Sequence, residues 1–231
     1  MLAAYATGFH SDDPLSVLEV GQRPDPQPAD GWVTVEVKAA SLNHHDLWSL
    51  RGIGLAESAL PMILGCDAAG IDPDGREVIV HSVIGSAAAG GGDETFDPDR
   101  SLLSEKHQGT LAQKVSVPRE NVLPKPTALS FEEAACLPTA WLTAYRMLFT
   151  RGQLQPGETV LVQGAAGGVG TAAIQVAKAL GARVIAVVSD DTKAAVATRA
   201  GADAWALRDV AAPGVGVGAP PDGFNQQGQD W

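Results

Sequence analysis

The residues best suited to chemistry in this 231-residue chain are the glycines of 164–170, which read Gly-Ala-Ala-Gly-Gly-Val-Gly. A pyrophosphate needs exposed backbone N–H groups at the start of a helix and no Cβ atom in its path. We expect Gly164 to make the turn, Gly167 to allow the close approach, and Gly170 to let the helix pack on the strand. The predicted dinucleotide-binding residues of this turn are Gly164, Ala165, Gly167, Gly168 and Val169.

The segments on either side of these glycines support that interpretation. A β-branched run precedes them at 159–163, and apolar residues at helical spacing follow from Val169 to Leu180. Gly181 stands where a helix-ending glycine belongs, and 182–188 is an apolar strand of the kind buried in parallel sheets. This strand–turn–helix–strand order favours nucleotide binding over the alternative of a plain glycine-rich turn.

The residues after the second strand bear on which nicotinamide dinucleotide is bound. Asp190 follows the turn at about the 20-residue spacing of an acid that binds the ribose of NAD. Val188 and Ser189, however, occupy the strand end where that acid belongs, and Ser189 with Lys193 could hold a 2′-phosphate instead. Alternatively, Asp190 and Asp191 only place negative charge at the start of the next helix. We therefore favour NADP(H) over NAD(H).

The elements that must position these residues divide the chain into a β-rich and an α/β part. Strands are predicted at 31–40, 76–83, 115–117 and 122–123. A polar loop at 85–108 is either a functional flap or a mobile insert. Ser130, with glutamates at 132 and 133, predicts a helix start, and a second helical stretch covers 141–149.

Composition and charge exclude several classes of protein. With 45% hydrophobic and 19% charged residues, we expect a folded core. The net charge of −11 disfavours nucleic acid or an anionic membrane as a partner. The longest apolar region, 165–188, is interrupted by polar and charged residues, and the N-terminus lacks a signal-peptide layout. Cys66 and Cys136 form no Cys-x-x-Cys pair, so we expect a reduced, cytoplasmic protein.

Three motifs together resemble the medium-chain dehydrogenase/reductase superfamily. They are Asn-His-His-Asp at 43–46 with Arg-Gly at 51–52, Leu-Gly-Cys-Asp-Ala-Ala-Gly at 64–70, and Leu-Thr-Ala-Tyr at 142–145. The chain is most similar to the quinone-oxidoreductase-like and zinc-free alcohol-dehydrogenase-like branches. The resemblance implies a GroES-like β-barrel catalytic domain, a Rossmann domain, a cleft for a small-molecule substrate, and a homodimer for full-length members.

We accordingly predict an α/β chain with a GroES-like catalytic domain at 1–125 and a partial Rossmann domain at 126–209. The Gly/Pro-rich tail at 210–231 is predicted to be disordered. After the second strand we find one helix and a short segment at 203–207, with no candidate for a third parallel strand or a second βαβαβ half. The sequence thus indicates a C-terminally truncated member, and an inactive remnant is the alternative to an active enzyme.

The resemblance also bears on zinc. Zinc-dependent members hold the metal with Cys, His and Cys, next to a glutamate. The corresponding positions here are Asn43, Cys66 and Thr139, with Asp67 in place of the glutamate. One soft thiolate and two poor neutral ligands do not make a tight tetrahedral site, so we expect no zinc. Thr139 is then left to contact the cofactor. A different site from His81, His107 and Cys66 is an alternative that no ligand spacing supports.

Without a metal, hydride transfer still needs a donor for the oxygen that gains charge. By resemblance, Asn43 and Thr143 lie beside the nicotinamide and Asp46 braces the loop. His45 falls where zinc-dependent relatives place the hydroxyl of their proton relay, and an imidazole there could protonate a reduced oxygen. Alternatively, His44 and His45 form only a polar helix start. We predict a zinc-independent NAD(P)H-dependent oxidoreductase acting on a quinone, enone, aldehyde or alcohol.

Overall fold

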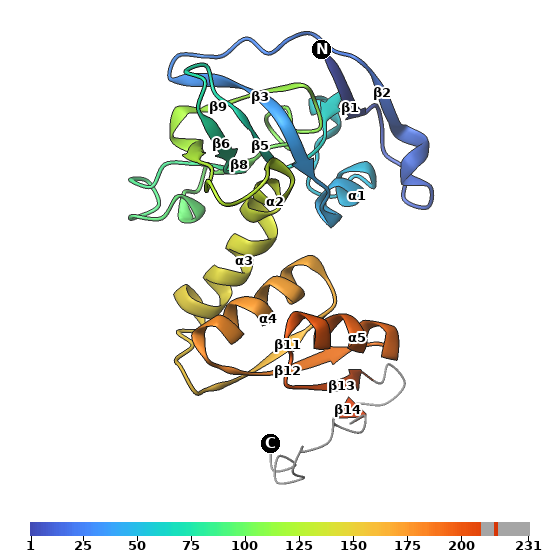
Figure 1. Cartoon of the computed structure of the whole chain (residues 1–231). Coiled ribbons are helices and arrows are strands. Elements are labelled where there is room, and N and C mark those ends of the chain that lie inside the picture. The colour runs from blue at the N-terminus through green and yellow to red at the C-terminus, as the bar shows by residue number, and fades with distance from the viewer. Residues whose placement is uncertain (209–214, 217–231) are drawn as a thin grey trace. The chain divides into compact units, whose positions relative to one another are not determined.

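The computed structural model describes residues 1–208 and 215–216 (Figure 1). The chain divides into two compact units, Met1–Thr139 and Ala140–Trp231, called unit 1 and unit 2 below. Apart from 215–216, the tail predicted at 210–231 lies outside the described residues. Within the described residues, no helix combines the length and apolar character needed to cross a membrane.

Unit 1 is organised around an antiparallel five-stranded sheet, in the order β10-β6-β5-β3-β9. Its strands are β3 (Trp32–Ser41), β5 (Asp67–Ile71), β6 (Glu77–Val80), β9 (Lys114–Pro118) and β10 (Val122–Pro124). Alternating valines of these strands, such as Val35, Val80 and Val117, are fully buried and form the core beneath the sheet. The period-two pattern of the sequence is therefore expressed as one apolar face.

Two smaller sheets complete the β structure of unit 1. A three-stranded sheet has the order β2-β1-β4, and a two-stranded sheet joins β7 to β8. The bounds are β1 (Leu2–Ala6), β2 (Leu18–Gln22), β4 (Met62–Ile63), β7 (Val83–Ile84) and β8 (Ser101–Leu102). The prediction of one continuous strand over 76–83 is wrong in its second half. Its backbone leaves the sheet after Val80, where His81 N donates to Asn121 O (2.8 Å), and β7 pairs with β8 instead.

The helices of unit 1 are short, and they fix the ends of strands. They are α1 (His44–Leu50), α2 (Phe131–Ala135) and the 3₁₀ turns η1 (Pro14–Val17), η2 (Glu57–Ala59), η3 (Glu94–Phe96) and η4 (Arg119–Asn121). The helix start predicted at Ser130 is confirmed, because Ser130 and Glu133 exchange side-chain-to-backbone hydrogen bonds as a capping box.

The helical stretch predicted at 141–149 lies in a longer run of π and α turns. It comprises η5 (Leu137–Trp141), α3 (Leu142–Tyr145) and η6 (Arg146–Arg151).

Unit 2 contains three parallel strands in the order β11-β12-β13, with β14 antiparallel to β13. The elements are β11 (Thr159–Gln163), α4 (Gly168–Leu180), β12 (Arg183–Val188), α5 (Asp191–Ala200), β13 (Ala204–Arg208) and β14 (Val215–Gly216). Helices α4 and α5 contact each other and lie on one side of the sheet (Figure 1). Helix α4 ends at Gly181 in the left-handed conformation (φ 88°), as the sequence predicts.

The expectation that no third parallel strand exists is wrong. Segment 204–208 pairs in parallel with β12, with Ile185 opposite Ala204 and Val188 opposite Leu207. Its alternation of buried alanines with Trp205 and Leu207 does not give the continuous apolar run of a fully covered parallel strand. The described residues therefore include one complete βαβαβ unit, built on β11, β12 and β13.

Candidate cofactor and catalytic sites

The glycine turn of unit 2 joins the end of β11 to the start of α4. Gly164 takes a left-handed conformation (φ 61°), and Gly167 N donates to Gly164 O (2.9 Å) to close the turn. At Gly170, a Cβ atom would lie 2.4 Å from Gly164 O and 2.7 Å from Ala165 Cα. Only glycine fits there, because the helix packs directly on the backbone of the turn.

The space in front of this helix start is open. A Cβ atom at Gly167 would meet nothing closer than Gly164 O at 3.4 Å, and one at Gly168 would reach Ala140 Cβ at 3.7 Å. The first N–H groups of α4 have no acceptor within the helix, and the helix dipole places partial positive charge on them. The residues present thus fit the pyrophosphate of a dinucleotide.

Ser189 and Lys193 come together after the end of β12. Lys193 Nζ donates to Ser189 Oγ (2.6 Å) and lies 3.4 Å from Asp190 Oδ2. Asp190 caps α5, since its Oδ1 accepts from Lys193 N (2.9 Å). That backbone N–H and the Ser189 hydroxyl lower the pKa of the Asp190 carboxyl. The alternative of a helix-capping acid is therefore realised in the structure, while Ser189 and Lys193 remain exposed together.

Thr143 and Thr139 have different surroundings. Thr143 is exposed on α3, which packs against α4 within unit 2. Thr139 belongs to unit 1, where its Oγ1 donates to Asp67 Oδ1 (2.5 Å). The two threonines expected at the cofactor thus differ, because only Thr139 is engaged in a hydrogen bond to a buried acid.

Asp67 is the centre of the candidate site in unit 1. Its side chain is fully buried, and Oδ2 accepts from Ser41 Oγ (2.7 Å) and Asn43 Nδ2 (2.9 Å), while Oδ1 accepts from Thr139. Asn43 and Thr139, which are 96 positions apart, are therefore held on one carboxylate. No sequence pattern indicated Ser41, although it pairs directly with Asp67 across β3 and β5.

The residues at the zinc-ligand positions do not fit a zinc ion. Asn43 and Thr139 each donate a hydrogen bond to Asp67, and an amide and a hydroxyl are neutral groups that bind zinc poorly. Cys66 is the one soft ligand among the three positions, and in the structure burial raises the pKa of its thiol to about 12. In the described part of the chain, no three His, Cys, Asp or Glu residues are grouped so as to hold a metal.

The alternative metal site of His81, His107 and Cys66 is also contradicted. His81 Nε2 lies 3.3 Å from Glu94 Oε1, and the His107 ring packs against Trp32 with ring centroids 5.0 Å apart. Neither histidine belongs to a group of metal-ligating side chains among the described residues.

Asp46 braces the start of α1 against the chain before β5. Its Oδ2 accepts from Asn43 N (2.8 Å) and its Oδ1 accepts from Gly65 N (2.9 Å). Burial raises the pKa of the Asp46 carboxyl, although both N–H donors act in the opposite direction. The carboxylate therefore ties the two segments that carry Asn43 and Cys66.

His45 points into a cluster that also includes residues from the polar loop at 85–108. Its Nε2 lies 3.0 Å from Glu105 Oε1, and its Nδ1 lies 3.3 Å from both Cys66 Sγ and Ser104 Oγ. The alternative of a merely polar helix start thus describes His44, which is stacked near Trp48, better than His45. Ser104 and Glu105 were missed, since no local spacing connects them to His45.

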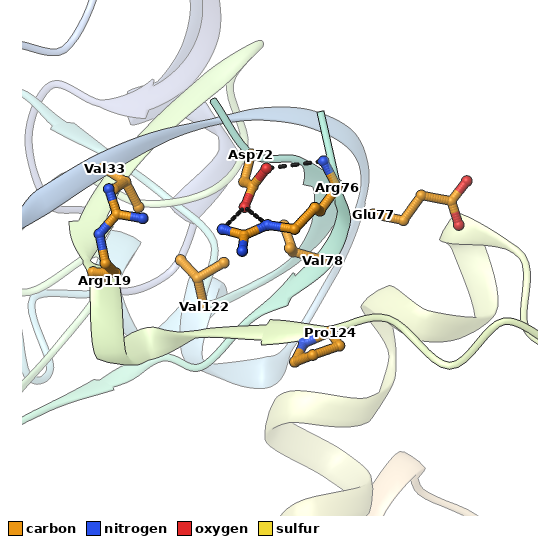
Figure 2. A pocket seen from close by; sticks show the side chains of 8 residues that line it. All are labelled: Val33, Asp72, Arg76, Glu77, Val78, Arg119, Val122 and Pro124. Atoms are coloured by element: carbon orange, nitrogen blue, oxygen red, sulfur yellow. Dashed lines mark hydrogen bonds and ion pairs between the residues drawn. The ribbon is translucent and has the colours of Figure 1, made fainter. Parts of the chain in front are cut away.

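A cavity of about 320 Å³ elsewhere in unit 1 is lined by residues that stabilise a turn (Figure 2). In it, Asp72 accepts from Arg76 Nε (2.7 Å), Arg76 N (2.9 Å) and Asp74 N (2.9 Å). The Arg76 guanidinium lowers the pKa of the Asp72 carboxyl, and the charges in this corner neutralise one another. These bonds hold the turn at 72–75, and no predicted site residue lines the cavity.

Comparisons with known proteins place both units. Residues 29–127 match the family described as the alcohol dehydrogenase GroES-like domain, and 168–210 match the family described as zinc-binding dehydrogenase. An acryloyl-coenzyme A reductase of Metallosphaera sedula is 34% identical over 191 residues. That alignment covers 77% of this chain and 57% of the reductase.

Solved structures agree with these matches. An NAD-dependent alcohol dehydrogenase is 37% identical with a TM-score of 0.80, over 90% of this chain and 63% of that one. A quinone oxidoreductase from Thermus thermophilus, solved also with NADPH, is 35% identical with a TM-score of 0.69, over 90% and 60%. The chain therefore spans about three fifths of the length of these three proteins.

Proposed function

Because the chain belongs to the medium-chain dehydrogenase/reductase superfamily, we propose that it is an NADPH-dependent reductase that works without zinc. The observation that carries the proposal is the set of hydrogen bonds that the Asp67 carboxylate accepts. Its carboxylate accepts hydrogen from Asn43 and Thr139, the residues at two of the three zinc-ligand positions. A side-chain hydrogen-bond network thus takes the place of the metal centre of zinc-dependent relatives.

The loss of a metal narrows the class of substrate. A zinc ion stabilises the alkoxide that forms when hydride adds to an isolated carbonyl. A conjugated C=C–C=O acceptor takes hydride at its β-carbon and spreads the negative charge over an enolate, so it depends less on a Lewis acid. We therefore favour enones, quinones and enoyl thioesters over aldehydes and alcohols. The names of two relatives, acryloyl-coenzyme A reductase and quinone oxidoreductase, support this choice.

The protein's own groups have separate tasks in such a reaction. When bound, the reduced nicotinamide supplies a hydride. The N–H groups at the start of α4 bind the pyrophosphate, and Lys193 with Ser189 binds the 2′-phosphate. Asp46 fixes the loop that carries Asn43 and His45, and the His45 imidazole gives the proton that the reduced substrate needs. Both cysteines are free thiols, which suits the reduced cytoplasm expected from the sequence.

The test of this proposal is a titration of the purified chain with NADPH and with NADH, followed by nicotinamide fluorescence and metal analysis. We expect NADPH to bind more tightly than NADH, and less than one tenth of a zinc ion per chain. Lys193→Ala should weaken NADPH binding about tenfold or more, through loss of a charge-assisted contact, and leave NADH binding unchanged. Lys106→Ala, which changes an exposed lysine of unit 1, is the matched control.

Three outcomes contradict the proposal in different parts. One tightly held zinc per chain overturns the zinc-free mechanism. Equal effects of Lys193→Ala on both cofactors overturn the preference for NADPH. No binding of either cofactor at millimolar concentration favours the alternative of a chain without activity.

A further inference from the structure

Three polar side chains of unit 1 contact the His45 imidazole from opposite sides of the ring. Glu105 Oε1 lies 3.0 Å from Nε2, while Cys66 Sγ and Ser104 Oγ both lie 3.3 Å from Nδ1, on the other side of the ring. These groups meet opposite ring nitrogens, so they do not surround a common point where a metal could bind. The order carboxylate–imidazole–hydroxyl or thiol is that of an oriented acid or base.

The two sides of the imidazole are held differently. A carboxylate oxygen only accepts, so the contact with Glu105 places a hydrogen on Nε2. In the neutral ring, Nδ1 is then an acceptor, facing two groups at 3.3 Å, a longer distance than the contact to Glu105. The Cys66 thiol stays protonated because burial raises its pKa to about 12, so it is a weak donor here and not a nucleophile. Nδ1 is therefore the ring nitrogen with the longer contacts, and it is the one that takes up a second hydrogen when the ring is protonated.

The backbone of the loop is arranged to keep this geometry. Ser104 is fully buried and takes a left-handed conformation (φ 64°), which non-glycine residues rarely adopt. Ser104 N donates to His107 O (2.8 Å), and this tight turn lets two consecutive residues, Ser104 and Glu105, reach opposite sides of one ring. Retained backbone strain of this kind is typical of functional positions.

Glycine and an adjoining cavity leave room for the Glu105 carboxylate. A Cβ atom at Gly54 would lie 3.2 Å from Glu105 Oε1, so a larger residue there would crowd the contact with His45. Glu105 also lines a cavity of about 400 Å³, together with Thr95 and Arg100. The carboxylate thus touches solvent on one side and the imidazole on the other, while the His45 side chain is only 17% exposed.

We propose that Glu105 is a positioning residue for His45, which holds the imidazole with hydrogen on Nε2 and leaves Nδ1 as the nitrogen that exchanges the reacting proton. In the protonated ring, Nδ1 then gives its proton to the substrate anion and becomes an acceptor, while the other hydrogen stays on Nε2, where it is hydrogen-bonded to Glu105. The charge on the substrate is neutralised by that one proton, and His45 regains it from water. This inference rests on the proposed reductase function.

The first test does not depend on turnover. The ring nitrogens of His45 are observed by ¹⁵N NMR in the full chain and assigned by their loss in His45→Gln. We expect the Nε2–H form in the wild type, loss of that preference in Glu105→Ala, and its retention in Glu105→Gln, which keeps an acceptor oxygen. The matched control is Glu94→Ala, since Glu94 and His81 form a similar pair in the same unit.

The second test is turnover with NADPH and a quinone. Glu105→Ala should lower kcat about 100-fold with little change in the KM for NADPH, Glu105→Gln should recover part of it, and Glu94→Ala should have no effect. An unchanged His45 tautomer in Glu105→Ala, or a kcat loss no larger than in Glu94→Ala, overturns the inference. If the wild type binds no NADPH, the proposed function fails, and the NMR result alone then decides whether Glu105 orients His45.

Discussion

The glycine turn of unit 2 and the Asp67 site of unit 1 are built from different parts of the chain. The turn presents backbone N–H groups, and its shape is set by the absence of side chains at Gly164 and Gly170. The Asp67 site consists of side-chain hydrogen bonds to one buried carboxylate. A backbone site tolerates any substitution that leaves its space open, whereas a buried side-chain network depends on each donor and acceptor. In the turn, therefore, only a side chain that meets the backbone should lower stability, whereas at the Asp67 site the loss of any hydrogen-bond partner should lower it.

The sharpest contrast should be in thiol chemistry next to the Asp67 site. Cys66 is buried with a pKa raised to about 12, whereas Cys136 is exposed. Because the thiolate is the nucleophile, we expect iodoacetamide at pH 8 to alkylate Cys136 at least about 1000-fold faster than Cys66. Mass spectrometry should find one label per folded chain, two in guanidinium chloride, and none on folded Cys136→Ser. Rapid labelling of both cysteines in the folded chain would show that Cys66 is a thiolate available to a metal.

The glycine turn is tested by two substitutions three residues apart. Gly170→Ala places a Cβ atom against the backbone of the turn, so we expect it to lower the free energy of unfolding by about 3 kcal/mol or more. Gly167→Ala, whose site is open, should change stability by less than about 1 kcal/mol but should weaken NADPH binding. Urea unfolding and fluorescence titration separate the two effects. Equal destabilisation by both, or full NADPH affinity in Gly167→Ala, would contradict a backbone phosphate site.

The Asp67 network should be sensitive to the loss of its acceptor. Asp67→Ala leaves the hydroxyls of Ser41 and Thr139 and the amide of Asn43 without their partner, and we expect a loss of about 2 to 3 kcal/mol in unfolding experiments. Dialysis of the wild type against EDTA should leave its stability unchanged. A drop in stability on chelation would mean that a metal, and not the hydrogen-bond network, holds this pocket together.

The difference between the locally formed turn and the long-range contacts of the Asp67 site also decides what could be predicted from the sequence. The course of the chain from β11 to β12 follows local signals, so the strand Thr159–Gln163 and the helix end at Gly181 match the structure. In unit 1, the residues around Asp67 and His45 meet over long separations: Ser41 is 26 positions from Asp67, and Glu105 is 60 from His45. Such contacts depend on strand register and loop path, which no local spacing encodes.

Resemblance to a family supplied part of what spacing lacked. It assigned Asn43, Cys66 and Thr139 to the zinc-ligand positions of relatives, and the structure shows that Asn43 and Thr139 both donate to Asp67. It could not point to Ser104 or Glu105, because that contact belongs to the loop at 85–108. The third parallel strand was missed for a different reason, since its alternating pattern resembles a half-exposed strand.

The smallest expected effect concerns the side-chain contacts of Asp203 in unit 2, the unit that contains the glycine turn. Desolvation raises the pKa of its carboxyl, but the hydrogen bonds from Lys178 Nζ (2.7 Å) and Val184 N (2.7 Å) outweigh it, so the pKa is lowered overall. A carboxyl with a lowered folded-state pKa stabilises the protein above its unfolded value, near 4, and this contribution is lost as the pH falls further. Because the pair is partly exposed, solvent screening reduces the effect, and Asp203→Asn should cost about 1 kcal/mol at pH 7. The difference between variant and wild type should shrink between about pH 5 and pH 3 in urea unfolding. A difference that stays constant over this range would assign the contact to neutral hydrogen bonding, and unit 2 would then owe no stability to this ion pair.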